Sequence, residues 1–173
     1  TIQSRCQRFD FRNIPASSIA EHLTAVLKKE GVSAEPELVF QIARLGNGSM
    51  RDALSLLDRL IASGEKKLTV KTLEELLGLP ARELVGTLLD AFATGTPGPA
   101  LEAGDTLLKR GISIDQVLES LLERLRDLLV LATCGGNTEL VELSDEARKI
   151  ETARSAKLDP AAAVHMIAMV ESI

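Results

Sequence analysis

The chain has 173 residues, of which 45% are hydrophobic, 2% are aromatic and none is Trp or Tyr. Its formal net charge is −5, and residues 79–173 hold nine basic against fifteen acidic side chains. Because nucleic-acid binding depends on clustered Lys and Arg and on stacking aromatics, this composition disfavours a DNA- or RNA-binding surface. Leu and Ala carry most of the apolar content, and both are strong helix formers, so we expect an all-α fold.

Two cysteines, Cys6 and Cys134, stand far apart without metal-ligand spacing. Isolated cysteines of this kind are typical of reduced thiols in a cytoplasmic protein. The sequence has neither a signal peptide nor an apolar run of about 18 residues, so we expect neither export nor a membrane-spanning segment. The chain begins at Thr1 rather than Met, and we expect it to be a piece of a longer polypeptide.

Near the start, residues 7–11 (Gln-Arg-Phe-Asp-Phe) alternate polar and apolar side chains. This period of two is typical of a β-strand, and Pro15 follows as a stop. A single strand leaves its backbone groups without partners, so we expect its sheet to lie outside this sequence. Residues 1–15 are therefore predicted to be the remnant of a separate domain.

Four short amphipathic helices are predicted next, within residues 16–78. Each opens at a capping residue or a proline and closes at a glycine, as helix ends commonly do. Ser18 with Glu21 has the spacing of a capping box at the first of them. Together the four predict one compact helical domain. In chain order they run from Ser18 to Gly31, from Pro36 to Gly46, from Ser49 to Gly64 and from Thr69 to Gly78.

Leu79-Pro80 marks a predicted domain boundary, and longer helices follow it. Ser113 with Gln116 predicts a capping box for one of them, in which leucines cover more than one face. Such a helix needs neighbours on two sides, so residues 79–173 predict a second helical domain. The predicted helices cover 81–94, 99–110, 114–132, 145–156 and the stretch from Pro160 to the end.

Arg51 is the first candidate site residue. It lies in the first turn of a predicted helix, within Gly48-Ser49-Met50-Arg51-Asp52. A cation at this position opposes the helix dipole unless something negative is close. One interpretation is a solvated arginine paired with Asp52. The other is that Arg51, with the backbone N–H groups of the helix end, binds a nucleotide phosphate.

Arg5 is the second candidate. It lies just before the predicted strand, on a short segment that holds three arginines. An arginine held in this way suits insertion into the active site of a neighbouring subunit, where it would stabilise charge on a transferring phosphoryl group. The alternative is an ordinary surface residue.

Two segments, read together, resemble one family. Residues 1–11 (Thr-Ile-Gln-Ser-Arg-Cys-Gln-Arg-Phe-Asp-Phe) and residues 48–58 (Gly-Ser-Met-Arg-Asp-Ala-Leu-Ser-Leu-Leu-Asp) are similar to the bacterial DNA polymerase III gamma/tau subunits, clamp-loader ATPases of the AAA+ superfamily. The resemblance is close over residues 1–78 and rests on the helical pattern alone over 79–173. It implies an all-α chain with a remnant of the nucleotide-binding domain at 1–15, a helical lid domain at 16–78 and a truncated α-helical collar domain at 79–173.

The resemblance also implies roles for the two arginines. Arg5 would be the arginine finger that acts in trans on a neighbour's ATP, and Arg51 the sensor-2 arginine that contacts the γ-phosphate of its own subunit's ATP. Through residues 79–173 the subunit would join other clamp-loader subunits in a hetero-pentameric ring, which loads a sliding clamp onto primer–template DNA. ATP and Mg²⁺ would be cofactors of the intact protein, and we expect this chain alone to be inactive.

Several features of the family are missing from the sequence. It holds no Gly-rich phosphate loop, no acidic Mg²⁺-binding motif and no cysteine cluster for zinc, and we expect these before Thr1. A different reading is a helical adaptor or scaffold without a nucleotide role, which would bind partner helices through the leucine-rich residues 114–132. A helix-turn-helix DNA-binding protein is a third alternative, and the charge distribution disfavours it.

Overall fold

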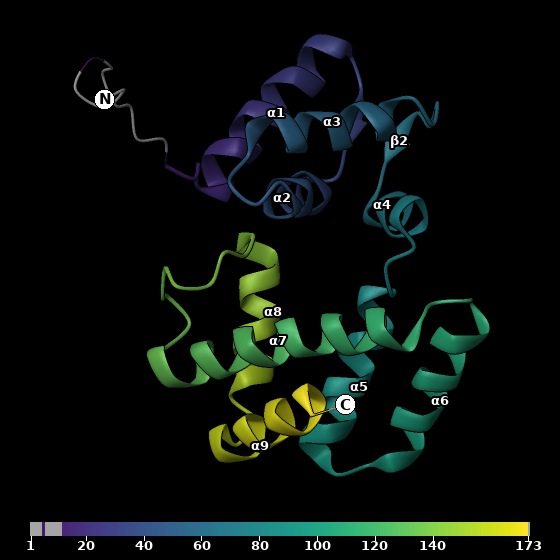
Figure 1. The fold of residues 1–173 in the computed structure, drawn as a ribbon, viewed down its shortest axis with the longest axis vertical. Coiled ribbons are helices and arrows are strands. Elements are labelled where there is room, and N and C mark those ends of the chain that lie inside the picture. The colour runs from purple at the N-terminus through teal and green to yellow at the C-terminus, as the bar shows by residue number, and fades with distance from the viewer. Residues whose placement is uncertain (1–4, 6–11, 173) are drawn as a thin grey trace. The chain divides into compact units, whose positions relative to one another are not determined.

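The computed structural model describes residue 5 and residues 12–172 (Figure 1). The strand expected at 7–11 lies outside these described residues. Within them the chain is mostly helical, which confirms the all-α prediction. It divides into two compact units, Thr1–Leu68 and Thr69–Ile173. No helix of the described part is both long and apolar enough to cross a membrane.

In the part of the first unit that the structure describes, three helices pack with one short strand pair. Helix α1 contacts both α2 and α3, and the two strands pair in parallel, with Ser33 opposite Lys67 and Ala34 opposite Leu68. Strands this short are too brief to show alternation, so the sequence did not predict them. The elements are α1 (Ala16–Glu30), β1 (Ser33–Ala34), α2 (Pro36–Leu45), α3 (Met50–Ile61) and β2 (Lys67–Leu68).

Large aliphatic side chains fill the interior of this unit, and those on the helices repeat at helical spacing. They come from all three helices and from β2, and β1 is held through its pairing with β2. The fully buried ones are Ile19, Leu23, Leu38, Ile42, Leu57, Leu60 and Leu68.

The predicted helix starts are confirmed at Ser49 and Thr69, whose side chains accept hydrogen bonds from the amides three residues on. The capping box predicted at Ser18 is wrong. Helix α1 begins two residues earlier, directly after Pro15, and has no side-chain cap. Proline fixes its own φ near the helical value, and the next residue, Ala16, is buried, so the helix starts there.

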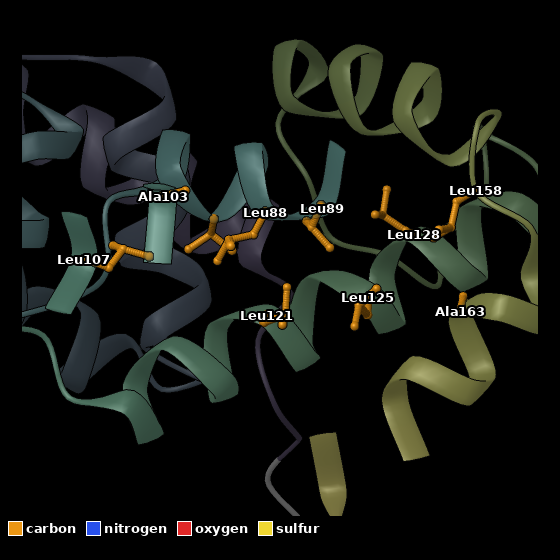
Figure 2. Close-up of a cluster of buried hydrophobic side chains, with 10 residues drawn as sticks. Leu88, Leu89, Ala103, Leu107, Leu121, Leu125, Leu128, Leu158 and Ala163 are labelled. Carbon is orange, nitrogen blue, oxygen red and sulfur yellow. The ribbon is translucent and has the colours of Figure 1, made fainter. Parts of the chain in front are cut away.

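Within the described residues the second unit holds six helices; α5, α6, α7 and α9 enclose one buried cluster of leucine, valine and alanine side chains (Figure 2), and a smaller cluster lies between α7, the following loop and α8. Helix α7 runs through its centre and contacts α5, α8 and α9, while α5 and α6 pack closely on each other. The capping box predicted for Ser113 and Gln116 is confirmed at the start of α7. The helices are α4 (Val70–Leu77), α5 (Arg82–Thr94), α6 (Pro97–Lys109), α7 (Ile114–Cys134), α8 (Asp145–Ser155) and α9 (Pro160–Glu171).

The two units divide after Leu68, ten residues before the boundary expected at Leu79-Pro80. Strand β2 ends at Leu68, paired with β1, and so belongs to the first unit. Helix α4 belongs to the second unit, where Glu74 Oε1 accepts a hydrogen bond from the Arg82 amide at 2.8 Å and caps α5. Partial burial raises the pKa of Glu74.

Charged side chains form an ionic network inside the second unit, named here the Glu151 network: Asp90, Arg124, Glu151 and Arg154, with the Arg82 guanidinium 3.9 Å from the Glu151 carboxylate. The Glu151 carboxylate accepts from Arg124 at 2.5 Å and from Arg154 at 2.9 Å. Arg154 also donates two bonds to Asp90, at 2.7 and 3.0 Å. These bonds join α5, α7 and α8.

The two arginines of the Glu151 network differ in environment. The hydrogen bonds to Asp90 raise the pKa of Arg154, and the same bonds lower the pKa of Asp90. Burial instead lowers the pKa of Arg124, because a buried cation loses hydration. Gly86 makes room for the network, since a Cβ there would lie 3.1 Å from an Arg154 guanidinium nitrogen.

A single arginine holds the loop between α7 and α8. The Arg148 guanidinium donates to the carbonyl oxygens of Gly136, Thr138 and Val141 at 2.9, 2.8 and 2.6 Å. The loop therefore has a fixed backbone although it holds no regular structure. Leu140, which is 75% exposed to solvent, lies in this loop.

Candidate functional site

The turn between α2 and α3 forms the base of the candidate site. Helix α2 ends at Leu45, and the next residues bend the chain so that α3 can start at Met50. Asn47 and Gly48 both have positive φ, 45° and 78°. Only glycine adopts this left-handed region freely, and asparagine is among the few other residues that tolerate it. The Gly-Asn-Gly-Ser sequence therefore matches the turn it forms.

Two close approaches in this turn require glycine. A Cβ on Gly46 would lie 2.8 Å from the Ala53 Cβ, because α3 passes directly over the end of α2. A Cβ on Gly48 would lie 2.5 Å from the Cβ of Asn13. The next residue, Ile14, donates its amide to the Gly48 carbonyl at 3.1 Å. The turn is thus fixed between α3 on one side and residues 13–14 on the other.

The first turn of α3 presents backbone donors at this fixed point. Ser49 Oγ accepts from the Asp52 amide at 3.3 Å, and the Ser49 carbonyl accepts from Ala53 at 3.2 Å. Within the described part of the chain, the amides of Met50 and Arg51 have no acceptor. Unpaired amides at a helix start point outward along the axis and favour an anion.

Arg51 is exposed at this same helix end. Its guanidinium makes no hydrogen bond or ion pair with any described residue, and so the pair with neighbouring Asp52 is not formed. A guanidinium beside two open amides can bind a phosphate through charge-assisted bonds. The arrangement can therefore hold an anion.

Arg5, the other candidate, lies in a turn and is exposed. Residues 6–11 lie outside the described residues, and no contact within the described part joins Arg5 to Arg51. Sequence reasoning also missed Asn13 and Ile14, which pack on the turn beside Arg51. The glycine pair of Gly-Asn-Gly, which implies a close neighbour, is the signal that could have pointed to them.

Family models match nearly all of the described chain. Residues 18–66 match the model described as "DNA polymerase III clamp loader subunit, ATPase lid domain". Residues 68–169 match the model described as "DNA polymerase III subunits gamma and tau domain III". The chain belongs to the DNA polymerase III gamma/tau family. The resemblance noted from two sequence segments is thereby confirmed, and the junction of the two matches falls where the two compact units divide.

Curated relatives from several bacteria agree with this family. The DNA polymerase III subunit tau of Bacillus subtilis is 32% identical over 142 residues, 82% of this chain and 25% of the relative. The gamma/tau subunit of Mycoplasma genitalium is 33% identical over 70% of this chain and 20% of its own length. Subunit tau of Escherichia coli is 28% identical over 83% of this chain and 23% of its own length. The chain thus spans about a quarter of the length of these relatives.

A nucleotide fits this gamma/tau chain only in part. The open amides of α3 with Arg51 suit one phosphate group. The sequence holds no Gly-x-x-x-x-Gly-Lys-Ser/Thr loop to cradle the remaining phosphates. Across residue 5 and residues 12–172, no group of three or more His, Cys, Asp or Glu side chains could hold a metal ion. The start of α3 therefore carries donors that suit one phosphate group, in a sequence without a phosphate loop.

Proposed function

We propose that this chain is the lid and subunit-associating part of a clamp-loader ATPase, which loads a sliding clamp onto primed DNA during replication. One observation supports the proposal above the others: the region matched to the ATPase lid carries Arg51 unpaired beside two open amides on a rigid turn. A helical adaptor without a nucleotide role gives no reason for an unpaired cation at the positive end of a helix dipole.

In this proposal Arg51 is the sensor-2 arginine. ATP, when bound to the intact protein together with Mg²⁺, supplies the negative charge of its γ-phosphate at the start of α3. Arg51 and the Met50 and Arg51 amides bind that charge and so hold residues 16–78, as the lid, against the nucleotide-binding domain. Hydrogen bonds to a charged group contribute about 1.5–3 kcal/mol each, so the loss of Arg51 should weaken this coupling about 10- to 150-fold.

Arg5 is proposed as the arginine finger. From the remnant at residues 1–15 it reaches a neighbouring subunit's ATP and stabilises charge on the transferring phosphoryl group. Residues 79–173 act as the collar, which joins other clamp-loader subunits in a ring of about five. Losing an arginine finger lowers turnover by about 10³- to 10⁵-fold.

The test uses the full-length protein assembled with its partner subunits. ATP binding and DNA-stimulated ATP hydrolysis are measured for Arg51→Ala and for Arg59→Ala, an exposed arginine at the other end of α3. We expect the first variant to impair both and the second to behave as wild type. Equal activity of the two variants would remove the basis for a nucleotide role.

Arg5→Ala is measured in the same assembly. We expect ATP binding at the wild-type level with hydrolysis strongly suppressed, because a finger in trans acts on the neighbour's ATP. A parallel loss of binding and hydrolysis would contradict the role in trans. The 173-residue chain alone should show no micromolar ATP affinity in calorimetric titration with Mg²⁺.

A further inference from the structure

The peptide group between Gly48 and Ser49 is held at both ends. Its N–H, which belongs to Ser49, donates to the Gly46 carbonyl at 2.7 Å. Its oxygen, which belongs to Gly48, accepts from the Ile14 amide at 3.1 Å. The first bond lies within the turn itself, whereas the second comes from the residues that precede α1. Ile14 thus fixes one end of the peptide group that leads into α3.

The segment around Ile14 is itself anchored. Ala16 is 3% exposed, and the Pro15 carbonyl accepts a backbone hydrogen bond from α1 at 3.1 Å. On the other side, Asn13 lies directly against Gly48, since a Cβ on this glycine would lie 2.5 Å from the Asn13 Cβ. The Ile14 amide is therefore presented to the turn by a backbone that is fixed on both sides.

The turn that Ile14 contacts has a conformation that needs support. Among the described residues, Asn47 is the one non-glycine residue with positive φ, and Gly48 follows it in the same region. Such conformations cost free energy and persist where surrounding contacts fix them. If the Gly48–Ser49 peptide group rotated, Ser49 would lose its place as the cap of α3. The two open amides that follow it would then change direction as well.

We propose that Ile14 is a positioning residue for the phosphate contact of Arg51, acting through Gly48. Its amide keeps the Gly48–Ser49 peptide group in the orientation that directs the open amides of α3 toward one anion. The inference rests on the proposed function, because it concerns the same site, and it adds a residue from outside the matched lid region, 18–66. Preorganised donors bind more tightly, because less ordering is needed on binding. By linkage, the bound anion in turn stabilises the Ile14 hydrogen bond.

The test is a titration of the 173-residue chain with sodium pyrophosphate at constant ionic strength, from about 0.1 to about 10 mM, the range for a weak contact. Binding is followed by NMR at the Met50 and Arg51 amides. We expect saturable shifts in wild type and in Arg59→Ala, and none in Arg51→Ala. Ile14→Pro removes the N–H and should raise the dissociation constant about 2- to 10-fold, the effect of one hydrogen bond. Ile14→Val keeps the N–H and should match wild type.

A purely structural role for Ile14 predicts a different result. It would lower the urea midpoint of Ile14→Pro and leave its pyrophosphate dissociation constant unchanged, because that constant is measured on folded molecules. Hydrogen exchange gives a second readout, on the wild-type chain. Saturating pyrophosphate should slow exchange of the Ile14 amide at least about two-fold, and Arg51→Ala should abolish this slowing.

Three results would overturn the proposal: no titration of the two amides in wild type, equal dissociation constants for Ile14→Pro and Ile14→Val, or exchange of the Ile14 amide that does not respond to pyrophosphate. None of these experiments uses ATP or the assembled complex. If Arg51→Ala loses ATP hydrolysis in the assembly while Ile14→Pro binds pyrophosphate normally, the proposed function stands and only the positioning role is refuted.

Discussion

Replacing Glu151 by Gln removes the central charge of the Glu151 network and keeps its volume. The side chains of Glu151, Arg124 and Arg154 are 5%, 13% and 14% exposed. Breaking a buried ion pair by removing one partner costs about 3–5 kcal/mol, because the other charge is left buried and uncompensated. Arg154 keeps its two bonds to Asp90, and Arg82 is the more exposed and more distant partner of Glu151, so Arg124 is the buried cation that loses most. We therefore expect Glu151→Gln to lower the free energy of unfolding by about 3 kcal/mol, the lower end of this range.

Within the described residues, the buried Arg124 Nε already has no hydrogen-bond partner, and a neutral amide in place of the carboxylate does not compensate the charge of this cation. A loss of about 3 kcal/mol is a large part of the 5–15 kcal/mol that stabilises a typical domain. The assay is urea unfolding followed by far-ultraviolet circular dichroism, since the chain has no Trp or Tyr for intrinsic fluorescence. The transition of the second unit should move to lower urea with its slope unchanged.

The control is Glu119→Gln on the exposed side of α7, which should stay within about 0.5 kcal/mol of wild type. A second variant tests the cause. Arg124→Met combined with Glu151→Leu removes both charges of the pair and should be more stable than Glu151→Gln, since no unpaired charge remains. If Glu151→Gln costs no more than the control, the reasoning from buried charge is refuted.

Three further changes test other parts of the structure. Gly46→Ala should destabilise the first unit by about 1–3 kcal/mol in urea unfolding, because its Cβ would overlap that of Ala53; an unchanged midpoint would contradict the close approach. Ser113→Ala removes the capping box of α7 and should lower the free energy of unfolding by about 1 kcal/mol in the same assay. A decrease of only a few tenths of a kcal/mol would contradict a stabilising role for this cap. The lowered pKa of Asp90 means that its bond to Arg154 stabilises the fold above the unfolded pKa, near 3.8, and that this contribution is lost as the pH falls through the lower folded value. In an acid titration, the Asp90→Asn variant should therefore lose less stability than wild type between neutral pH and pH 3. Parallel curves of stability against pH for the two proteins would contradict this expectation.

Local signals in the sequence predicted most helix positions. Ser49, Thr69 and Ser113 start helices in the structure because their caps depend only on residues three positions on. The same reasoning failed at Ser18, where Pro15 and the burial of Ala16 set the start of α1. A capping motif therefore predicts a helix start only where no neighbouring residue already fixes one.

Long-range contacts were not predictable in this way. Glu151 and Arg154 are three positions apart in a charged helix, a spacing typical of a solvated surface pair. Their partners Arg124 and Asp90 lie on other helices, and nothing local marks them. The same limit applies to the candidate site: Arg51 was predicted from its helix position, whereas the contact of residues 13–14 with Gly48 depends on the fold.

The Glu151 network also has a consequence for the rates of folding and unfolding. Its bonds join residues separated by 27 and 64 positions in the chain. Contacts between such distant residues form only after the chain between them is ordered, so we expect them to be absent from the folding transition state. Interactions that form so late mainly slow unfolding. Glu151→Gln should therefore shorten the lifetime of the folded second unit, measured in stopped-flow unfolding, while its refolding rate stays near wild type.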